Sequence, residues 1–77
     1  MSYVFSGKLE VSKGINPNFC FNFEKQKDDR AAENAAELML KMELSQFTVL
    51  GAVLKCGDRE VRKYPRIEKE SRIFVSV

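Results

Sequence analysis

Apolar and polar residues alternate over residues 3–12 of this 77-residue chain. Its apolar face carries aromatic and aliphatic side chains, namely Tyr3, Phe5, Leu9 and Val11. An alternation with a period of two is typical of a β-strand that has one face on a core and the other in water. Gly7 occupies an inward position, where the missing side chain predicts a bulge or a closely packed neighbour.

A second strand is predicted after a segment rich in turn residues, and three phenylalanines share one of its faces: Phe19, Phe21 and Phe23. Such a strongly apolar face needs a covering layer. Residues 30–44 predict that layer, because they are mostly good helix formers and follow Asp28 and Asp29, either of which can cap a helix. The stripe expected to pack on the sheet consists of Ala31, Ala35, Leu38, Met39 and Met42.

Strand character returns after the predicted helix. Residues 47–56 are almost all apolar, which predicts a central strand or one that is covered on both faces. A Gly-Asp turn leads into a return strand over residues 59–64, and a charged loop precedes a last strand over residues 72–77. The sequence therefore predicts a single α+β domain over residues 1–77. Its order is β-β-α-β-β-β, with a single helix packed on a mostly antiparallel sheet.

Composition excludes several kinds of site. The chain has no histidine, and its two cysteines, Cys20 and Cys56, lie far apart in the sequence. This combination supplies neither a zinc site nor a Ser-His or Cys-His nucleophile, and no glycine motif for binding phosphate is present. We expect both cysteines to be reduced thiols inside the fold, with a disulfide or redox role as the alternative. The sequence predicts no catalytic residue, no metal site and no cofactor, and therefore a non-enzymatic protein.

The sequence also predicts where the protein resides. Its N-terminal residues do not show the cationic and then apolar pattern of a secretion signal. Its apolar stretches are far shorter than the roughly 20 residues that cross a bilayer. We therefore expect a cytoplasmic protein without a membrane partner.

Positive charge is concentrated in the second half of the chain. Residues 1–44 hold six positive and seven negative side chains, whereas residues 45–77 hold seven positive and four negative ones. Basic residues beside an aromatic ring can contact phosphates and stack on a base. The predicted contact residues for nucleic acid, or for an acidic protein surface, are Lys55, Arg59, Arg62, Lys63, Tyr64 and Arg66. An ordinary solvated hairpin face is the favoured interpretation, and these contacts are the alternatives to it.

The last predicted strand is a second candidate interface. It contains Ile73, Phe74 and Val75, and no charged residue occurs from Ile73 to Val77. At a sheet edge, such a strand would accept a strand from a partner or from a second copy. Inside the sheet it would simply be part of the core, which is the favoured interpretation.

Residues 35–51 join a helix rich in alanine and methionine directly to a Phe-Thr-Val-Leu-Gly strand. This unit follows two amphipathic strands, and over roughly residues 19–56 the chain resembles small phage-encoded anti-CRISPR inhibitors. The resemblance implies a non-enzymatic protein that binds a CRISPR-Cas complex and blocks its engagement with DNA. Many such inhibitors imitate DNA with an acidic surface, whereas this chain has a formal net charge of +2. Blocking would then come from docking on protein, and the resemblance identifies no interface residue.

The sequence thus favours a small binding protein of phage or mobile-element origin that occupies a surface on a larger protein or ribonucleoprotein complex. The alternative is a nucleic-acid-binding module that uses the basic C-terminal hairpin. A homodimer formed through the last strand is a third hypothesis.

Overall fold

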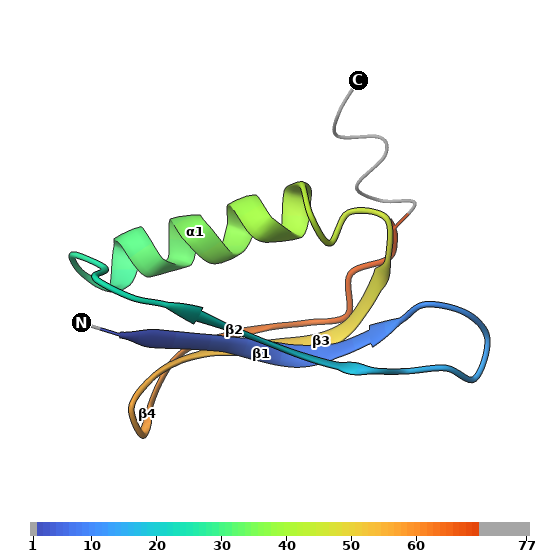
Figure 1. Ribbon diagram of the computed structural model, residues 1–77, viewed down its shortest axis with the longest axis horizontal. Helices are drawn as coiled ribbons and strands as arrows, with labels where there is room; N and C mark the ends of the chain where they lie inside the picture. Colours follow the sequence, from blue (N-terminus) through green and yellow to red (C-terminus); the bar gives the residue numbers. More distant parts are fainter. Residues whose placement is uncertain (1, 70–77) are drawn as a thin grey trace.

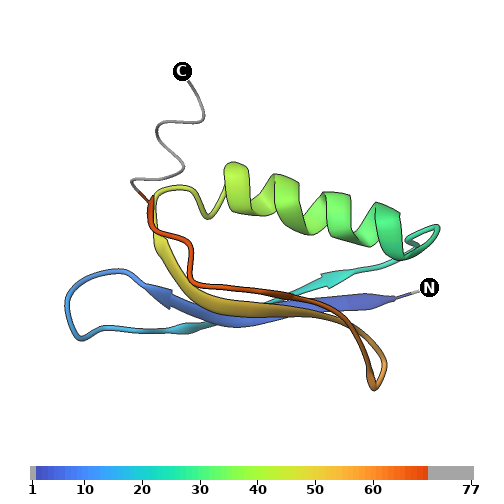
Figure 2. The same cartoon turned by 180° about the vertical axis from the view of Figure 1, so that it is seen from behind.

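The computed structural model describes residues 2–69, which form a four-stranded antiparallel sheet with one helix across one face (Figures 1 and 2). The elements are β1 (Tyr3–Glu10), β2 (Asn18–Phe23), α1 (Asp29–Lys41), β3 (Thr48–Cys56) and β4 (Arg59–Tyr64). The strands lie in the order β2-β1-β3-β4. The β1-β2 and β3-β4 hairpins therefore meet through β1 and β3 at the centre of the sheet, and β2 and β4 form its edges.

The α+β class is confirmed, but the predicted order β-β-α-β-β-β has one strand more than the structure describes. Residues 2–69 give β-β-α-β-β, and the last strand predicted over residues 72–77 lies outside the described residues. Strand β4 ends before Pro65, which has no amide hydrogen to donate to the ladder. The charged loop predicted after it instead bridges β3, because Ile67 and Val49 exchange two backbone hydrogen bonds of 2.9 and 3.0 Å.

The core lies between α1 and the sheet, as the alternating patterns predicted. Phe5 is completely buried at its centre, and its ring centroid lies 5.3 Å from that of Phe19 and 5.6 Å from that of Tyr64. The ring of Phe23 stacks on Phe5 at a centroid distance of 6.1 Å. The predicted phenylalanine face of β2 is therefore confirmed, and α1 covers it.

Helix α1 begins at the expected cap. The Asp28 carboxylate accepts a hydrogen bond of 2.9 Å from the amide of Ala31, which satisfies one of the amides that the first turn leaves without a helical partner. The helix ends at Lys41, three residues before the predicted end, and Leu44 is buried in the turn that follows. Among residues 2–69, no helix is both long and apolar enough to cross a membrane.

The predicted packing face of α1 is largely wrong, although one of its members, Met39, is partly buried and packs against the core. The buried residues of the helix are Ala32, Ala36 and Leu40. Leu38 and Met42, which were expected to face the sheet, are 58% and 65% exposed. The helix is thus rotated relative to the prediction, so that its small alanines allow a close approach to the sheet while an apolar stripe remains in solvent.

Gly7 is closely packed, as its inward position predicted. A Cβ atom at this residue would lie 2.2 Å from the carbonyl oxygen of Gly51 and 2.9 Å from the ring of Phe19. The register between β1 and β3 shifts immediately after this point, between Lys8 and Leu9. Both features allow the two central strands to approach and bend beneath the helix.

Candidate binding surface

The predicted basic hairpin does not form one cluster, because neighbouring strand residues face opposite sides of the sheet. Arg59, Arg62 and Tyr64 lie on the side that α1 covers, where they contact the helix or the core. Lys55 and Lys63 lie on the opposite side, next to strand partners Val4 and Val53. Arg66 lies beyond β4 and pairs with Glu68.

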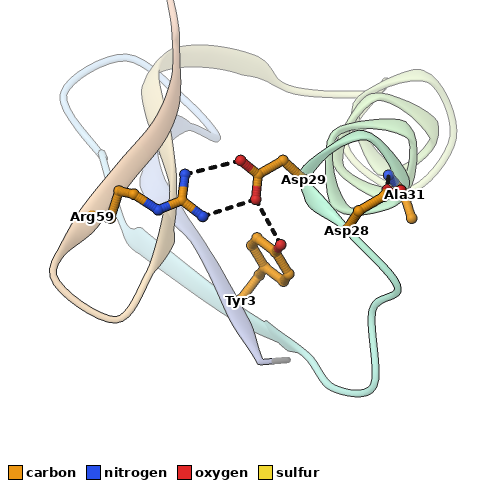
Figure 3. A network of polar contacts seen from close by, with 5 residues as sticks. All are labelled: Tyr3, Asp28, Asp29, Ala31 and Arg59. Atoms are coloured by element: carbon orange, nitrogen blue, oxygen red, sulfur yellow. Dashed lines mark hydrogen bonds and ion pairs between the residues drawn. The ribbon is translucent and has the colours of Figure 1, made fainter.

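Arg59 fastens the start of α1 to the sheet. Its guanidinium donates two hydrogen bonds of 2.9 Å to the Asp29 carboxylate, in the first turn of the helix (Figure 3). The buried Tyr3 hydroxyl of β1 donates to the same carboxylate at 2.7 Å. Two strands and the helix N-terminus are therefore joined through one acidic side chain, and Arg59 is occupied within the fold.

The network shifts the pKa values of its members in opposite directions. Hydrogen bonds from Arg59 and Tyr3 lower the pKa of Asp29 from 3.8 to about 2. The hydrogen bond to Asp29, together with burial and the negative charge of the carboxylate, raises the pKa of Tyr3 from 10.0 to about 12. The carboxylate also raises the pKa of Arg59, so this side chain stays charged throughout.

These shifts predict how the stability depends on pH. Because the pKa of Asp29 is lower in the folded chain, its ionised form favours folding above about pH 4, and this contribution is lost as the pH falls through about 2. We expect Asp29→Asn to lower the free energy of unfolding at pH 7, and the difference from the unsubstituted chain to close between pH 4 and pH 2. Urea denaturation at a series of pH values measures it. A difference that stays constant over this range would contradict the assignment.

Arg62 and Tyr64 are also used inside the fold. Arg62 lies 3.3 Å from both Glu33 and Glu37 of α1, and its guanidinium carbon is 5.2 Å from the centroid of the Tyr64 ring. Tyr64 is only 7% exposed, and its hydroxyl has no hydrogen-bond partner among residues 2–69. Burial raises the pKa of this hydroxyl. The aromatic ring that was predicted to stack on a base is therefore covered by α1 and Arg62.

The face of the sheet opposite α1 is left uncovered by residues 2–69 (Figure 1). It holds a shallow depression of about 640 Å³ over the centre of β1 and the adjoining parts of β2 and β3. The depression is lined by Ser6, Gly7, Lys8, Asn18, Phe19, Cys20, Leu50 and Gly51. Gly51 keeps it open, because no heavy atom lies within 4 Å of the position that its Cβ would occupy.

Three lysines on adjoining strands lie on this face, which we call the open face. Lys8 belongs to β1, Lys55 to β3 and Lys63 to β4. Within the described part of the chain, Lys8 and Lys55 form no ion pair, and Lys63 has only a long contact of 3.9 Å with Glu60. Sequence reasoning missed Lys8, although the alternation over residues 3–12 had already placed it on the outward side of the first strand.

The structure also bears on the chemistry that the sequence excluded. Among residues 2–69, no group of three or more cysteine, aspartate or glutamate side chains could hold a metal ion. Both thiols are free, but Cys20 is exposed on the open face and not inside the fold, because its two phenylalanine neighbours take the covered side. Comparison of the chain with protein-family models, with curated proteins and with solved structures finds no match.

Proposed function

We propose that this chain is a small, non-enzymatic binding protein that docks on a larger protein or ribonucleoprotein complex through the open face of its sheet. The observation that carries the proposal is that the basic residues on the two sides of the sheet differ in their pairing with acidic residues of the fold. On the covered side, Arg59 and Arg62 are held by carboxylates of α1. On the open side, Lys8 and Lys55 form no ion pair among residues 2–69, and Lys63 has only a long contact of 3.9 Å with Glu60.

The chemistry of the open face defines the partner surface that would fit it. Half-buried Val4 and Val53 lie directly opposite Lys55 and Lys63 in the strand ladder. An apolar centre with a charged rim is the usual anatomy of a protein interface. The matching surface would be apolar at its centre and acidic around it, so that the lysines speed association and set the orientation.

The resemblance to anti-CRISPR inhibitors makes a CRISPR-Cas complex the partner class in this proposal. A positively charged inhibitor would act by covering a protein surface that the complex needs for engaging DNA. This mode of inhibition requires no catalysis and no cofactor, only a rigid surface of sufficient area. The proposal places the chain in the cytoplasm of a host cell, encoded by a phage or mobile element.

The proposal is tested by measuring the binding of the purified chain to a panel of purified CRISPR-Cas effector complexes. We expect binding to at least one complex, and we expect Lys55→Glu combined with Lys63→Glu to weaken it about tenfold or more. The matched control reverses two lysines away from the open face, Lys13 in the β1-β2 loop and Lys41 at the end of α1, with the same change in net charge. Equal loss in both double variants, or no binding to any complex, would contradict the proposal.

Nucleic acid is the alternative partner, because lysines on an open sheet face also suit phosphate groups. A steep loss of affinity with rising salt is the signature of such contacts. The purified chain is therefore titrated with a generic duplex and a generic single strand at two salt concentrations. Flat, undetectable binding at low salt is expected, and salt-sensitive binding that Lys55→Glu removes would replace the proposed protein partner by nucleic acid.

A further inference from the structure

The two edges of the sheet differ in how well they are protected. Strand β4 is bounded by Pro65 and carries Arg59, Glu60, Arg62 and Lys63, and such charges discourage a further strand from pairing. Strand β2 reads Asn-Phe-Cys-Phe-Asn-Phe, with no charge and no proline. Among residues 2–69, β1 is its sole strand partner. Within the described part of the chain, the outer edge of β2 therefore has no strand beside it.

The hydrogen-bonding pattern between β1 and β2 shows which backbone groups of β2 point away from β1. Leu9 donates a hydrogen bond of 2.9 Å to the carbonyl of Pro17, so Pro17 points inward toward β1. Antiparallel strands alternate between residues that bond the neighbour and residues that do not. Every second residue after Pro17 therefore directs its backbone groups toward β1, and these residues are the phenylalanines of β2. The amides and carbonyls of the intervening residues, Asn18, Cys20 and Asn22, point outward.

These outward residues form a palindrome. The sequence Asn18-Phe19-Cys20-Phe21-Asn22 reads the same in both directions about Cys20. In an antiparallel pair of identical strands centred on Cys20, every residue of this segment lies opposite a residue of the same type. Cysteine is opposite cysteine, asparagine opposite asparagine and phenylalanine opposite phenylalanine. All three outward backbone positions fall in the hydrogen-bonding phase at once.

We propose that β2 pairs antiparallel with β2 of a second copy of this chain, with Cys20 opposite Cys20 of the second copy. Six backbone hydrogen bonds would then join the copies, two at each of three residue pairs. The phenylalanines would form close cross-strand aromatic pairs on the covered side. On the open face, asparagine amides would face one another beside the two thiols. A continuous sheet across both copies follows, with both helices on the same side.

An exposed apolar stripe of α1 lies on the same side as this edge. Phe23, at the end of β2, lines a hollow of about 240 Å³ together with Leu38 and Met42 of the helix. The acidic residues that pair with Arg62 of β4 occupy the other flank of α1. The predicted but unburied stripe is therefore directed toward the approaching copy. Pairing would bring apolar groups of a second chain toward it, whereas a solvated edge leaves it exposed.

The first experiment measures mass by sedimentation of the full chain under reducing conditions across a range of concentrations. An interface of this limited size predicts a weak, concentration-dependent dimer. Cys20→Lys places two like charges directly opposite each other and should give a monomer, whereas Cys20→Ser, which changes neither size nor charge appreciably, should leave the dimer intact. A chain that stays monomeric at about 1 mM, or a dimer that persists in Cys20→Lys, overturns the proposal.

The second experiment tests the register by cross-linking. In a Cys56→Ser chain, the oxidant diamide takes up the two electrons and two protons that two Cys20 thiols release when they form a disulfide. Directly opposed residues lie within disulfide range. The register control carries Cys20→Ser and Asn22→Cys, which moves the thiols about 13 Å apart along the strands. We expect cross-linking at least about tenfold faster through Cys20 than through position 22. Equal rates overturn the register.

The proposal is independent of the open-face function, since both measurements use this chain alone. Pairing of β2 with residues 70–77 of the same chain, or with a strand of another protein, would leave a monomer without a Cys20 cross-link. Either result would overturn the self-pairing and leave the binding test on CRISPR-Cas complexes unaffected.

Discussion

Phe5→Ala is expected to lower the free energy of unfolding by about 4 kcal/mol, because a large buried ring would be replaced by a cavity. Phe5 is completely buried and its ring contacts aromatic rings from both edges of the sheet, Phe19 and Phe23 on β2 and Tyr64 on β4. A chain of this length has a total stability of roughly 4–12 kcal/mol. The loss is therefore comparable with all the stability that the fold possesses.

Urea denaturation followed by circular dichroism measures this effect. The control is Val11→Ala, an apolar truncation at a residue that is 44% exposed just beyond β1, for which we expect a change below about 0.5 kcal/mol. If Phe5→Ala cost less than about 2 kcal/mol, the rings around it would have to close the cavity by moving together. Such a small loss would contradict the assignment of Phe5 to a tightly packed, rigid centre of the core.

The strands at the start of the chain were predictable, because burial on one face leaves a period of two in the sequence. Tyr3, Phe5 and Leu9 face the core where the alternation placed them, whereas Val11 lies beyond the end of β1 and is exposed. The cap at Asp28 was also predictable from its chemistry alone, since a carboxylate before a run of helix formers satisfies the free amides. These features depend on neighbours in the sequence.

The face of α1 was not predictable from local pattern. Alanines occur in adjacent pairs, Ala31 with Ala32 and Ala35 with Ala36, so two apolar stripes about 100° apart are available on the same helix. The stripe with Leu38 and Met42 is the more hydrophobic of the two, yet the smaller side chains are buried. Contacts made far away in the sequence accompany this choice, among them Arg62 of β4. A single sequence does not reveal which strand lies beside the helix.

The candidate site was predictable only in part for a related reason. Residues of the basic hairpin are close in sequence, but side chains alternate between the two faces of a strand. Together with a register shift after Leu54, this alternation places the basic residues on different faces of the sheet. This alternation could be read from the sequence, and it would have placed Lys63 on the face opposite to Arg62 and Tyr64. The palindrome around Cys20 was equally visible in the sequence, but it indicates self-pairing only when β2 is known to be an edge strand.

Gly7→Ala is expected to destabilise the chain by about 3 kcal/mol, although it adds just one methyl group. The added Cβ would lie 2.2 Å from the Gly51 carbonyl oxygen and 2.8 Å from the Ala52 Cα, and both of these are backbone atoms that cannot rotate away. The Phe19 ring, at 2.9 Å, blocks the remaining direction. The clash of the added methyl group can therefore be removed only if β1 and β3, the two central strands, move apart.

Gly51→Ala is the matched control, because it makes the same chemical change on the neighbouring strand. Nothing lies within 4 Å of its Cβ position and its backbone has no positive φ, so alanine fits there. We expect no loss, or a gain of up to about 1 kcal/mol, since alanine restricts the unfolded chain more than glycine does. Urea denaturation of both variants compares them directly. Equal stability of the two would mean that β1 and β3 are not held at the close approach on which the bend of the sheet, and with it the open depression beside Lys8, depends.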